Sequence, residues 1–434
     1  MTGLLDLAPE ILVQIVRSVH IYPLQSDAIL YKLARTCRRL YQVTEPFLYT
    51  KLVQPRRKQT RQLLRTILEK PDYAARVKTI SLYLRNDEDR YRYRYHNPII
   101  RRTHRRESDE DRENDEVLAR QKEREIELFV GAYDGLGIIE TSELSREQWI
   151  SALKERKEAA LVALLLLSLP NLDKVNIVID SHDGAFFFSR AIIAACSSQQ
   201  ERVHLQHVKD VTMDPERSED CIRTEELVPI FYLPSLERLS VFQAGLNDFE
   251  FEPPLSSCPV ASIEFMDSGV AGDAAPTLFS VLKHLKHIVF QPGSPKCKFH
   301  RLIHQTEIAS IGYNLHLVSA TLESLDLSRL GFDESNLKSV PSLHDFPKLK
   351  KVSIQLAYIM SSENELWELM PPAIEELYLG TDGCGSLSRD DMVREVMELV
   401  LRKEEKFPEL KKVVFEGGDE NLRDICLTKG IEFA

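Results

Sequence analysis

The sequence predicts an α/β protein in which three short N-terminal helices precede a solenoid of irregular repeats with a curved parallel sheet. Two observations lead to this prediction. Apolar residues recur at helical spacing over residues 5–52. Beyond residue 169, a short pattern of alternating aliphatic residues recurs along the chain, as expected for one strand per repeat. With 434 residues, 43% of them apolar, the chain can form two domains or one elongated domain.

The first stretch, residues 5–52, reads as three helices. Pro9 suits the first turn of a helix because its missing N–H would have no partner there. Pro23 ends this helix, Ser26 offers an N-cap to the second, and Pro46 stops the third. A unit of about 48 residues rarely builds a self-sufficient core. Its exposed aliphatic side chains would therefore be covered by a partner protein or a neighbouring domain.

The motifs in this stretch have a family likeness. Leu7-Ala8-Pro9-Glu10-Ile11-Leu12 is followed by Leu33-Ala34-Arg35-Thr36-Cys37-Arg38-Arg39-Leu40 and by Pro46-Phe47-Leu48-Tyr49. Residues 1–52 thus resemble an F-box, especially the fungal kind. Ala8 stands where the family usually has a proline, and Leu40 stands where many members have a tryptophan.

The resemblance implies a function in the ubiquitin conjugation pathway. An F-box binds the Skp-type adaptor of an SCF ubiquitin ligase, and through it cullin and RING subunits, while the rest of the chain binds a protein substrate. The chain would then be a non-catalytic receptor subunit. An alternative is a scaffold or regulatory protein that binds the adaptor alone, without cullin. The adaptor-binding residues implied are Leu5, Leu7, Pro9, Ile11, Leu12, Ile15, Leu40, Phe47, Leu48 and Tyr49.

The next segments link this module to the repeats. Residues 53–84 predict an amphipathic linker helix and a first repeat strand that alternates apolar and polar residues. Residues 85–127 carry a basic block and then an acidic block, and this composition predicts a poorly ordered insertion. Tyrosines alternate with arginines in the basic block and could stack on nucleic-acid bases, but the acidic block opposes this. Helices are predicted over residues 115–133 and 146–167.

Residues 128–434 are predicted to form the solenoid. A Leu-x-x-Leu-x-Leu pattern recurs, beginning at Leu172, Leu236, Leu285, Leu322, Leu349, Ile374 and Leu410, with weaker copies at 208–213 and 260–265. The copies lie roughly 24 to 37 residues apart, against about 20–29 for regular leucine-rich repeats. Each repeat would supply one strand, and stacked repeats would share a core. The sequence therefore predicts irregular leucine-rich repeats.

Residues between the buried strand positions are predicted to line the concave face of this solenoid. Aromatic residues among them are the kind that anchor interfaces, although each could equally do no more than cover the sheet. The substrate-binding candidates are Tyr83, Asn176, Phe242, Gln291, Asp326, Gln355 and Tyr378.

No catalytic motif or cofactor-binding motif is recognisable in the sequence. A zinc site from His284, His287, Cys297, His300 and His304 was considered, but it has a single cysteine, so surface histidines are the preferred interpretation. Cys384 between two glycines reads as a loop cysteine. The seven cysteines lack paired spacing, no signal peptide or membrane span is recognisable, and the net charge of −11 opposes nucleic-acid binding. We expect cytoplasm or nucleus, and no cofactor or metal.

Overall fold

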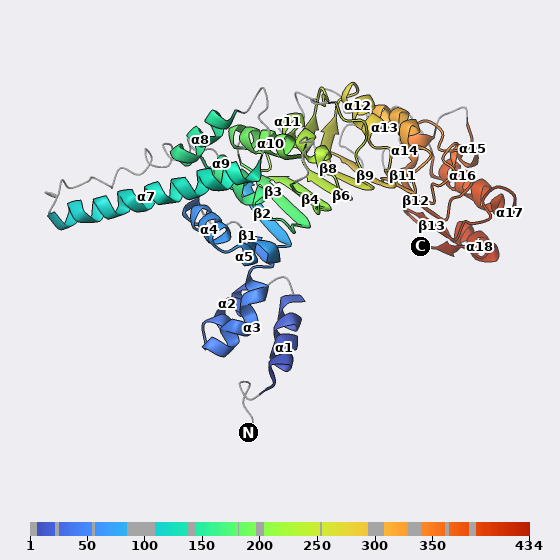
Figure 1. The fold of residues 1–434 in the computed structure, drawn as a ribbon. Helices are drawn as coiled ribbons and strands as arrows, with labels where there is room; N and C mark the ends of the chain where they lie inside the picture. The colour runs from blue at the N-terminus through green and yellow to red at the C-terminus, as the bar shows by residue number, and fades with distance from the viewer. Residues whose placement is uncertain are drawn as a thin grey trace, which may run out of the picture. The chain divides into compact units, whose positions relative to one another are not determined.

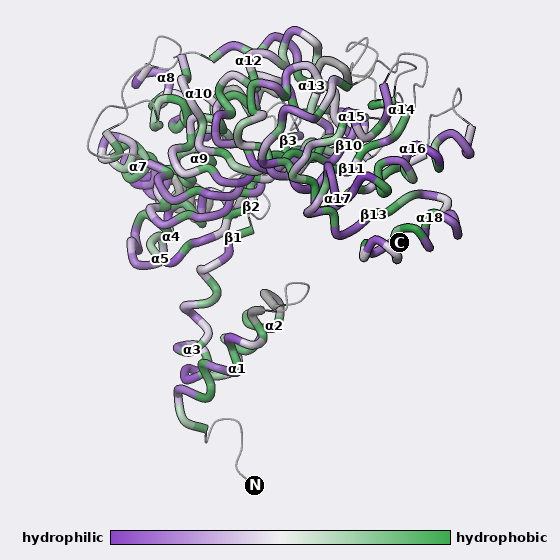
Figure 2. Tube along the Cα trace, turned by 90° about the vertical axis from the view of Figure 1, so that its right-hand side faces the viewer, coloured by the Kyte–Doolittle hydropathy of each residue, from purple (hydrophilic) through white to green (hydrophobic). Residues whose placement is uncertain are grey.

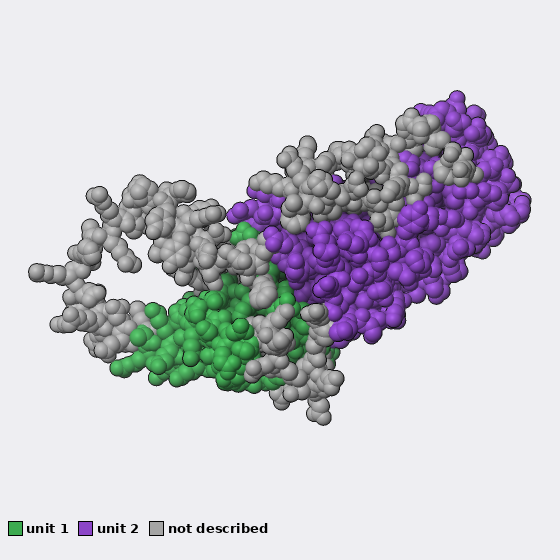
Figure 3. Space-filling view, turned by 90° about the horizontal axis from the view of Figure 1, so that it is seen from above, with its two compact units in different colours: residues 1–208 green, residues 209–434 purple. Residues whose placement is uncertain are grey.

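The structure is a computed structural model, and its chain divides into two compact units, Met1–Val208 (unit 1) and Lys209–Ala434 (unit 2) (Figure 3). The residues that it describes are 7–21, 26–53, 57–84, 109–137, 145–180, 182–196, 204–251, 254–293, 308–328, 340–360, 364–381 and 388–434. Each unit is an α/β structure in which strands pair in parallel and helices flank the strands (Figure 1).

Unit 1 begins with the three helices that the sequence predicts. They are α1 (Pro9–Ile21), α2 (Ser26–Ala34) and α3 (Arg38–Leu48). Their core consists of Leu12, Val16, Leu30, Ala34 and Leu40, all buried. The predicted stop at Pro46 is wrong, because α3 continues through this proline to Leu48. A proline in the last turn removes only one backbone hydrogen bond, so the helix tolerates it there.

A small parallel sheet follows in unit 1. Its strands are β1 (Lys51–Val53), β2 (Thr79–Leu84) and β3 (Lys174–Ile179). Leu52 pairs with Ile80, which in turn pairs with Val175, and all three are buried. β2 and β3 match the predicted strands. The short β1 was assigned to the helical module, because three residues are too few to show an alternating pattern.

Six helices are described in the rest of unit 1. They are α4 (Arg57–Glu69), α5 (Pro71–Arg76), α7 (Asp109–Leu136), α8 (Arg146–Glu155), α9 (Glu158–Leu167) and α10 (His182–Cys196). Every residue of α9 is buried, and α9 packs against α4, α7, α8, α10 and β2. A helix that is apolar on all sides needs such cover. The long aliphatic run Ala159–Leu167 is thus the centre of this unit's core.

The predicted insertion needs a correction. Residues 85–108 lie outside the described residues, but α7 begins at Asp109, so the predicted end of the poorly ordered segment at residue 127 is wrong. α7 is held by the buried Phe129 and by Glu125, which pairs with Arg61 at 2.9 Å and with Arg156 at 3.5 Å. Arg61 lies on α4 and Arg156 directly follows α8, so the charge pattern of this segment alone could not predict the pairing.

Unit 2 contains the predicted series of parallel strands. In order of neighbours they are β4 (Asp210–Pro215), β6 (Arg238–Phe242), β8 (Ser262–Val270), β9 (His287–Pro292), β10 (Ser324–Leu327), β11 (Lys351–Gln355), β12 (Glu376–Gly380), β13 (Lys412–Phe415) and β14 (Glu432–Phe433). Two further strands, β5 (Ile222–Arg223) and β7 (Ala244–Leu246), pair with each other, and β7 pairs with the end of β8. The repeated pattern predicts neither these two short strands nor β14.

The helices of unit 2 lie between these strands in the chain. They are α11 (Thr224–Leu227), η2 (Val228–Tyr232), α12 (Ala274–Val281), α13 (Ile308–Asn314), η3 (Leu315–Val318), α14 (Leu356–Ile359), α15 (Leu366–Leu369), α16 (Arg389–Leu401), α17 (Lys403–Lys406) and α18 (Glu420–Thr428). In Figure 1 they cover one face of the unit 2 strands.

The repeated aliphatic pattern explains the core of unit 2. In each copy, the first aliphatic residue is buried before the strand and the next two are buried within it, as Leu322, Leu325 and Leu327 are. One register line joins Val211, Leu239, Ile263, Ile288, Leu325, Val352, Leu377 and Val413, all of them buried. The predicted parallel sheet, with a strand at each copy of the pattern, is therefore confirmed for the described residues of unit 2, and β5 and β7 are additional to it.

Candidate protein-interaction surfaces

Exposed apolar side chains gather on the three N-terminal helices. Ile11 and Ile15 of α1 are 42% and 36% exposed, Ile29 and Tyr31 of α2 are 40% and 57% exposed, and Tyr41 of α3 is 42% exposed. Ile11 and Ile15 lie one turn apart and so share a helix face. Green, hydrophobic stretches recur along all three helices in Figure 2. We call these five residues together the helical apolar surface, although Ile29 and Tyr31 are two positions apart and so point to opposite sides of α2.

The predicted adaptor-binding residues divide into three groups. Pro9, Ile11 and Ile15 are exposed, and Leu7, Phe47, Leu48 and Tyr49 are partly exposed. Leu12 and Leu40 are buried between the helices, which corrects their assignment as contact residues. Leu5 lies outside the described residues.

Sequence reasoning did not name Ile29, Tyr31 or Tyr41 as contact residues, although all three are exposed. The signal for Tyr31 was its place directly after Leu30, because neighbouring residues on a helix point in different directions. Leu30 is buried and Tyr31 is exposed.

A tyrosine–glutamate cluster joins α3 to α5. The Tyr73 hydroxyl of α5 donates a short hydrogen bond to Glu45, and the Tyr41 hydroxyl donates to the same carboxylate at 2.9 Å. The hydrogen bond from Tyr73 lowers the pKa of Glu45, and the bond to Glu45 raises the pKa of Tyr41 to about 12. The ring of Tyr49 stacks on Tyr73 at 4.0 Å between centroids. Tyr49 thus packs against another residue of this chain, and the cluster holds the end of α3 against α5.

The second surface is the open face of the unit 2 strands. Buried and partly exposed residues alternate along each strand, and one register line of partly exposed residues crosses the unit. This line, which we call the central row, is Thr212, Ser240, Glu264, Val289, Asp326, Ser353, Tyr378 and Val414. Of the predicted substrate-binding residues, Asp326 and Tyr378 lie in this row, whereas Phe242, Gln291 and Gln355 lie two positions further along their strands.

The substrate-binding candidates differ in exposure. Phe242 is exposed, whereas Gln291, Asp326 and Tyr378 are partly exposed. Tyr83 and Asn176 lie on β2 and β3 of unit 1 and are also partly exposed, with the Asn176 amide donating to Ser81 at 3.1 Å.

The prediction that Gln355 binds the substrate is wrong, because its side chain is buried. Its amide donates a short hydrogen bond to the carbonyl of Ser328 and fills the space that a Cβ would occupy at Gly380. Gln355 therefore packs between β10 and β12 within the chain and is not available to a partner.

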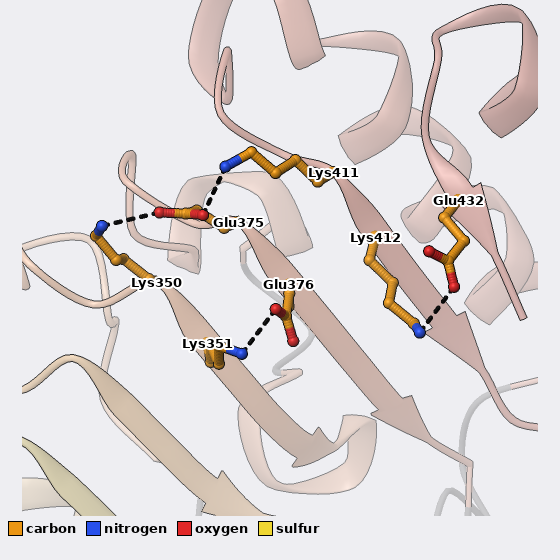
Figure 4. A network of polar contacts seen from close by, with 7 residues as sticks. All are labelled: Lys350, Lys351, Glu375, Glu376, Lys411, Lys412 and Glu432. Carbon is orange, nitrogen blue, oxygen red and sulfur yellow. Dashed lines mark hydrogen bonds and ion pairs between the residues drawn. The ribbon is translucent and has the colours of Figure 1, made fainter.

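Charged side chains alternate in sign at the amino ends of the strands (Figure 4). Lys350 and Lys411 both reach Glu375, at 2.9 and 2.7 Å. One residue further along, Lys351 pairs with Glu376 at 2.7 Å, and Lys412 pairs with Glu432 at 2.8 Å. Pairs of the same kind join Lys209 to Glu237 and Lys286 to Glu323. We call this series the lysine–glutamate ladder.

Sequence reasoning missed this ladder, although its signal lies in the repeated pattern itself. The two residues after the first aliphatic position are Lys-Lys, Glu-Glu and Lys-Lys in the last three copies, which begin at Leu349, Ile374 and Leu410. Such exposed pairs contribute little stability each, but like charges on opposite positions would be unfavourable. The lysine–glutamate ladder therefore favours the observed order of neighbouring strands in the sheet.

We expect Glu375 to make the free energy of unfolding fall at acid pH. Its hydrogen bonds from Lys411 and Lys350 lower its pKa from 4.5 to about 2. A pKa that is lower in the folded state gives a stabilisation that is present above the unfolded value and is lost as the pH falls toward the folded value. Between these two values, Glu375→Gln should lose less stability than the unchanged protein, measured by urea unfolding and circular dichroism. Glu368→Gln, at an exposed carboxylate of α15, is the control; equal losses in all three proteins would contradict this assignment.

Neither a metal site nor a membrane-crossing helix is found in the part of the chain that the structure describes. His284 and His287 are exposed, whereas Cys297, His300, His304 and Cys384 lie outside the described residues. The described cysteines Cys37, Cys196, Cys221, Cys258 and Cys426 form no disulfide. Burial raises the pKa of the Cys196 thiol to about 12 and that of Cys258 to about 11, which disfavours the reactive thiolate of either.

No protein-family model matches this sequence, and no curated protein is significantly similar to it. The helical apolar surface and the open face of the strands are thus the features on which a function can be argued.

Proposed function

We propose that the protein is the substrate-receptor subunit of an SCF-type E3 ubiquitin ligase. In this proposal α1, α2 and α3 form an F-box that binds the Skp-type adaptor, and the irregular leucine-rich repeats bind a target protein. The observation that supports it most is the helical apolar surface, in a segment whose motifs resemble an F-box.

The energetic reason is simple. Ile11, Ile15 and Ile29 keep about two-fifths of their surface in contact with water. A partner that covered them would gain about 1 kcal/mol for each, since full burial of an isoleucine contributes roughly 1.5–3 kcal/mol. Because the three helices already bury Leu12, Val16 and Leu30 among themselves, they can keep their fold while they present this surface.

The mechanism is proximity and involves no bond-making by this chain. A target held on the repeats and a ubiquitin carrier recruited through the adaptor would meet at a high effective concentration. This requires that the docking module be joined firmly to the repeats. Within unit 1, the Tyr73–Glu45 hydrogen bond and the Tyr49–Tyr73 stack hold α3 against α5 and so support the part of this connection that lies next to the three helices.

Adaptor binding tests the proposal directly. The double variant Ile11→Asp and Ile15→Asp should lose at least about tenfold in affinity for a purified Skp-type adaptor, because two carboxylates would lose hydration at the interface. The matched control is Tyr313→Asp and Leu317→Asp, which places the same charges on exposed apolar residues of α13 and η3. Binding is measured by calorimetry, and folding of each variant by circular dichroism. Equal affinity of both variants, or no binding of the unchanged chain, would overturn the proposal.

The scaffold alternative predicts a different assembly. Purification of the tagged protein should recover the adaptor together with cullin and RING subunits if the chain is a ligase receptor. Recovery of the adaptor without cullin, repeated with added purified cullin, would favour the scaffold.

A further inference from the structure

We propose that the open face around Phe242 binds an extended segment of the target that carries lysine or arginine. The surface consists of Asp214 on β4, Ser240 and Phe242 on β6, and Glu264 and Met266 on β8, and we call it the Phe242 surface. That the segment belongs to a ubiquitylation target rests on the proposed function above; the binding chemistry does not.

The register brings these side chains together. Met213 pairs with Val241, so Asp214 is level with Phe242 on the neighbouring strand. On the other side, Phe242 pairs with Met266 and Ser240 pairs with Glu264. The exposed ring is therefore flanked by one carboxylate at its own level and by a second one pleat away. An aromatic face with nearby carboxylates is suited to a lysine or arginine head group.

In the described part of the open face of the unit 2 strands, the charged side chains of the central row and toward the carboxyl ends of the strands are all negative. In the central row, and in the residues two positions further along each strand, the charged side chains are Asp214, Glu264, Asp326 and Glu416, with no lysine or arginine among the described residues. In the strands that carry the central row, the basic residues Arg238, Lys351 and Lys412 lie at the amino ends and pair there with carboxylates. A basic segment would thus meet no repulsion from this end of the strands.

Asp214 is the carboxylate that would gain most from a cation. Burial raises its pKa, and it has no hydrogen-bond or ion-pair partner among the described residues. Glu264, by comparison, accepts a hydrogen bond from the Ser240 hydroxyl at 3.0 Å. A partly buried carboxylate without a partner is costly, and an arriving ammonium or guanidinium group would offset that cost.

The backbone beside this surface is held in an unusual conformation. Gln243 and Asp267, which follow Phe242 and Met266, both have positive φ, at 53° and 49°. The Gln243 amide donates to Asp267 at 2.8 Å, and the backbone N–H of Ala244 donates to the Ser268 hydroxyl at 2.9 Å. Non-glycine residues rarely adopt this conformation, and those that do cluster at binding sites. Gln243 directly follows the end of β6, and Asp267 lies where the register of β8 against β9 shifts. Phe242 is therefore the last residue of its strand, next to this irregular backbone.

Strand spacing sets the pattern expected of the ligand. Glu264 and Asp326 lie on β8 and β10, two strands apart, which corresponds to about 9.6 Å at about 4.8 Å per strand. A peptide in the extended polyproline II conformation advances about 3.1 Å per residue with three residues per turn, so its residues i and i+3 point the same way about 9.3 Å apart and match this distance. We therefore expect basic residues at positions i and i+3 of the bound segment.

A peptide array tests the inference with the full-length protein. Immobilised peptides of about ten residues carry two arginines, two lysines or two glutamates, spaced by one, three or five positions, with the other positions randomised. We expect the i, i+3 arginine and lysine peptides to bind most and the glutamate peptides least, with binding that falls as salt rises. Preference for glutamate peptides, or equal binding of all spacings and charges, would overturn the inference.

Variants separate this surface from general electrostatics. Asp214→Asn with Glu264→Gln, and separately Phe242→Ala, should weaken binding of the best arginine peptide about tenfold in fluorescence anisotropy. The control Asp345→Asn with Glu368→Gln changes the net charge by the same amount at exposed residues outside the strands and should not weaken it. Equal weakening by the control would overturn the inference. These variants should retain adaptor binding, whereas Ile11→Asp with Ile15→Asp should retain peptide binding, so the two proposals fail independently.

Discussion

Replacing Trp149 with alanine is expected to destabilise unit 1 by about 3–5 kcal/mol, the range for removing a large buried aromatic side chain. Trp149 on α8 is fully buried and contacts Tyr133 of α7 and Phe187 of α10, with ring centroids 4.9 and 4.8 Å away. Trp149 therefore joins α8 to both α7 and α10. Urea unfolding followed by circular dichroism measures the change, and a loss below about 1 kcal/mol would contradict the assigned role.

The second tryptophan of the chain supplies the control. Trp367 on α15 is partly exposed, and its ring contacts the Arg402 guanidinium, which lies 4.3 Å from the ring centroid. Because an exposed cation–π contact contributes about 0.5–1 kcal/mol, Trp367→Ala should cost far less than Trp149→Ala. A comparable cost for both would mean that loss of any tryptophan, rather than the contacts of Trp149, is responsible.

Replacing Gly380 with alanine is expected to destabilise unit 2 by about 1–3 kcal/mol. The new Cβ would overlap the side-chain amide of Gln355, which is buried and donates to the Ser328 carbonyl. The amide would have to leave its place and lose that hydrogen bond. Urea unfolding again measures the change.

A double-mutant cycle identifies the cause. In a Gln355→Ala background the space beside Gly380 is free, so Gly380→Ala should cost less there than in the unchanged chain. Gly131→Ala is the matched control, because Gly131 lies in α7 and a Cβ there meets nothing within 4 Å. That change should be neutral or stabilising by about 0.5–1 kcal/mol, since alanine favours a helix. Strict additivity of Gly380→Ala and Gln355→Ala would rule out the overlap.

The sequence was sufficient to predict the periodic parts of the fold. The copies at Leu322 and Leu349 each contain three aliphatic residues at fixed spacing, and both became a buried position followed by a strand. Such strands are predictable because neighbouring repeats impose the same burial on the same positions. The three N-terminal helices were predictable for a similar reason, as helical spacing and capping signals agree there.

The remaining features depend on contacts between distant residues. β1 exists because Leu52 pairs with Ile80 across the chain, and α7 is anchored by Arg61 and Arg156, which its own composition does not reveal. The sequence also could not separate Leu12 from Ile11, since both are aliphatic and adjacent. Only the packing of α2 and α3 decides that Leu12 is buried and Ile11 is exposed.

The lysine–glutamate ladder restricts how this chain can change in length. If the repeating unit that contains β12 were lost, β11 would lie beside β13. Lys350 and Lys351 would then lie beside Lys411 and Lys412, and these like charges would repel each other at the amino ends of the two strands. Removing or duplicating two adjacent units would instead keep opposite charges next to each other. Gains and losses in this region should therefore be tolerated in even numbers, so that the repeats behave as alternating halves of a larger period.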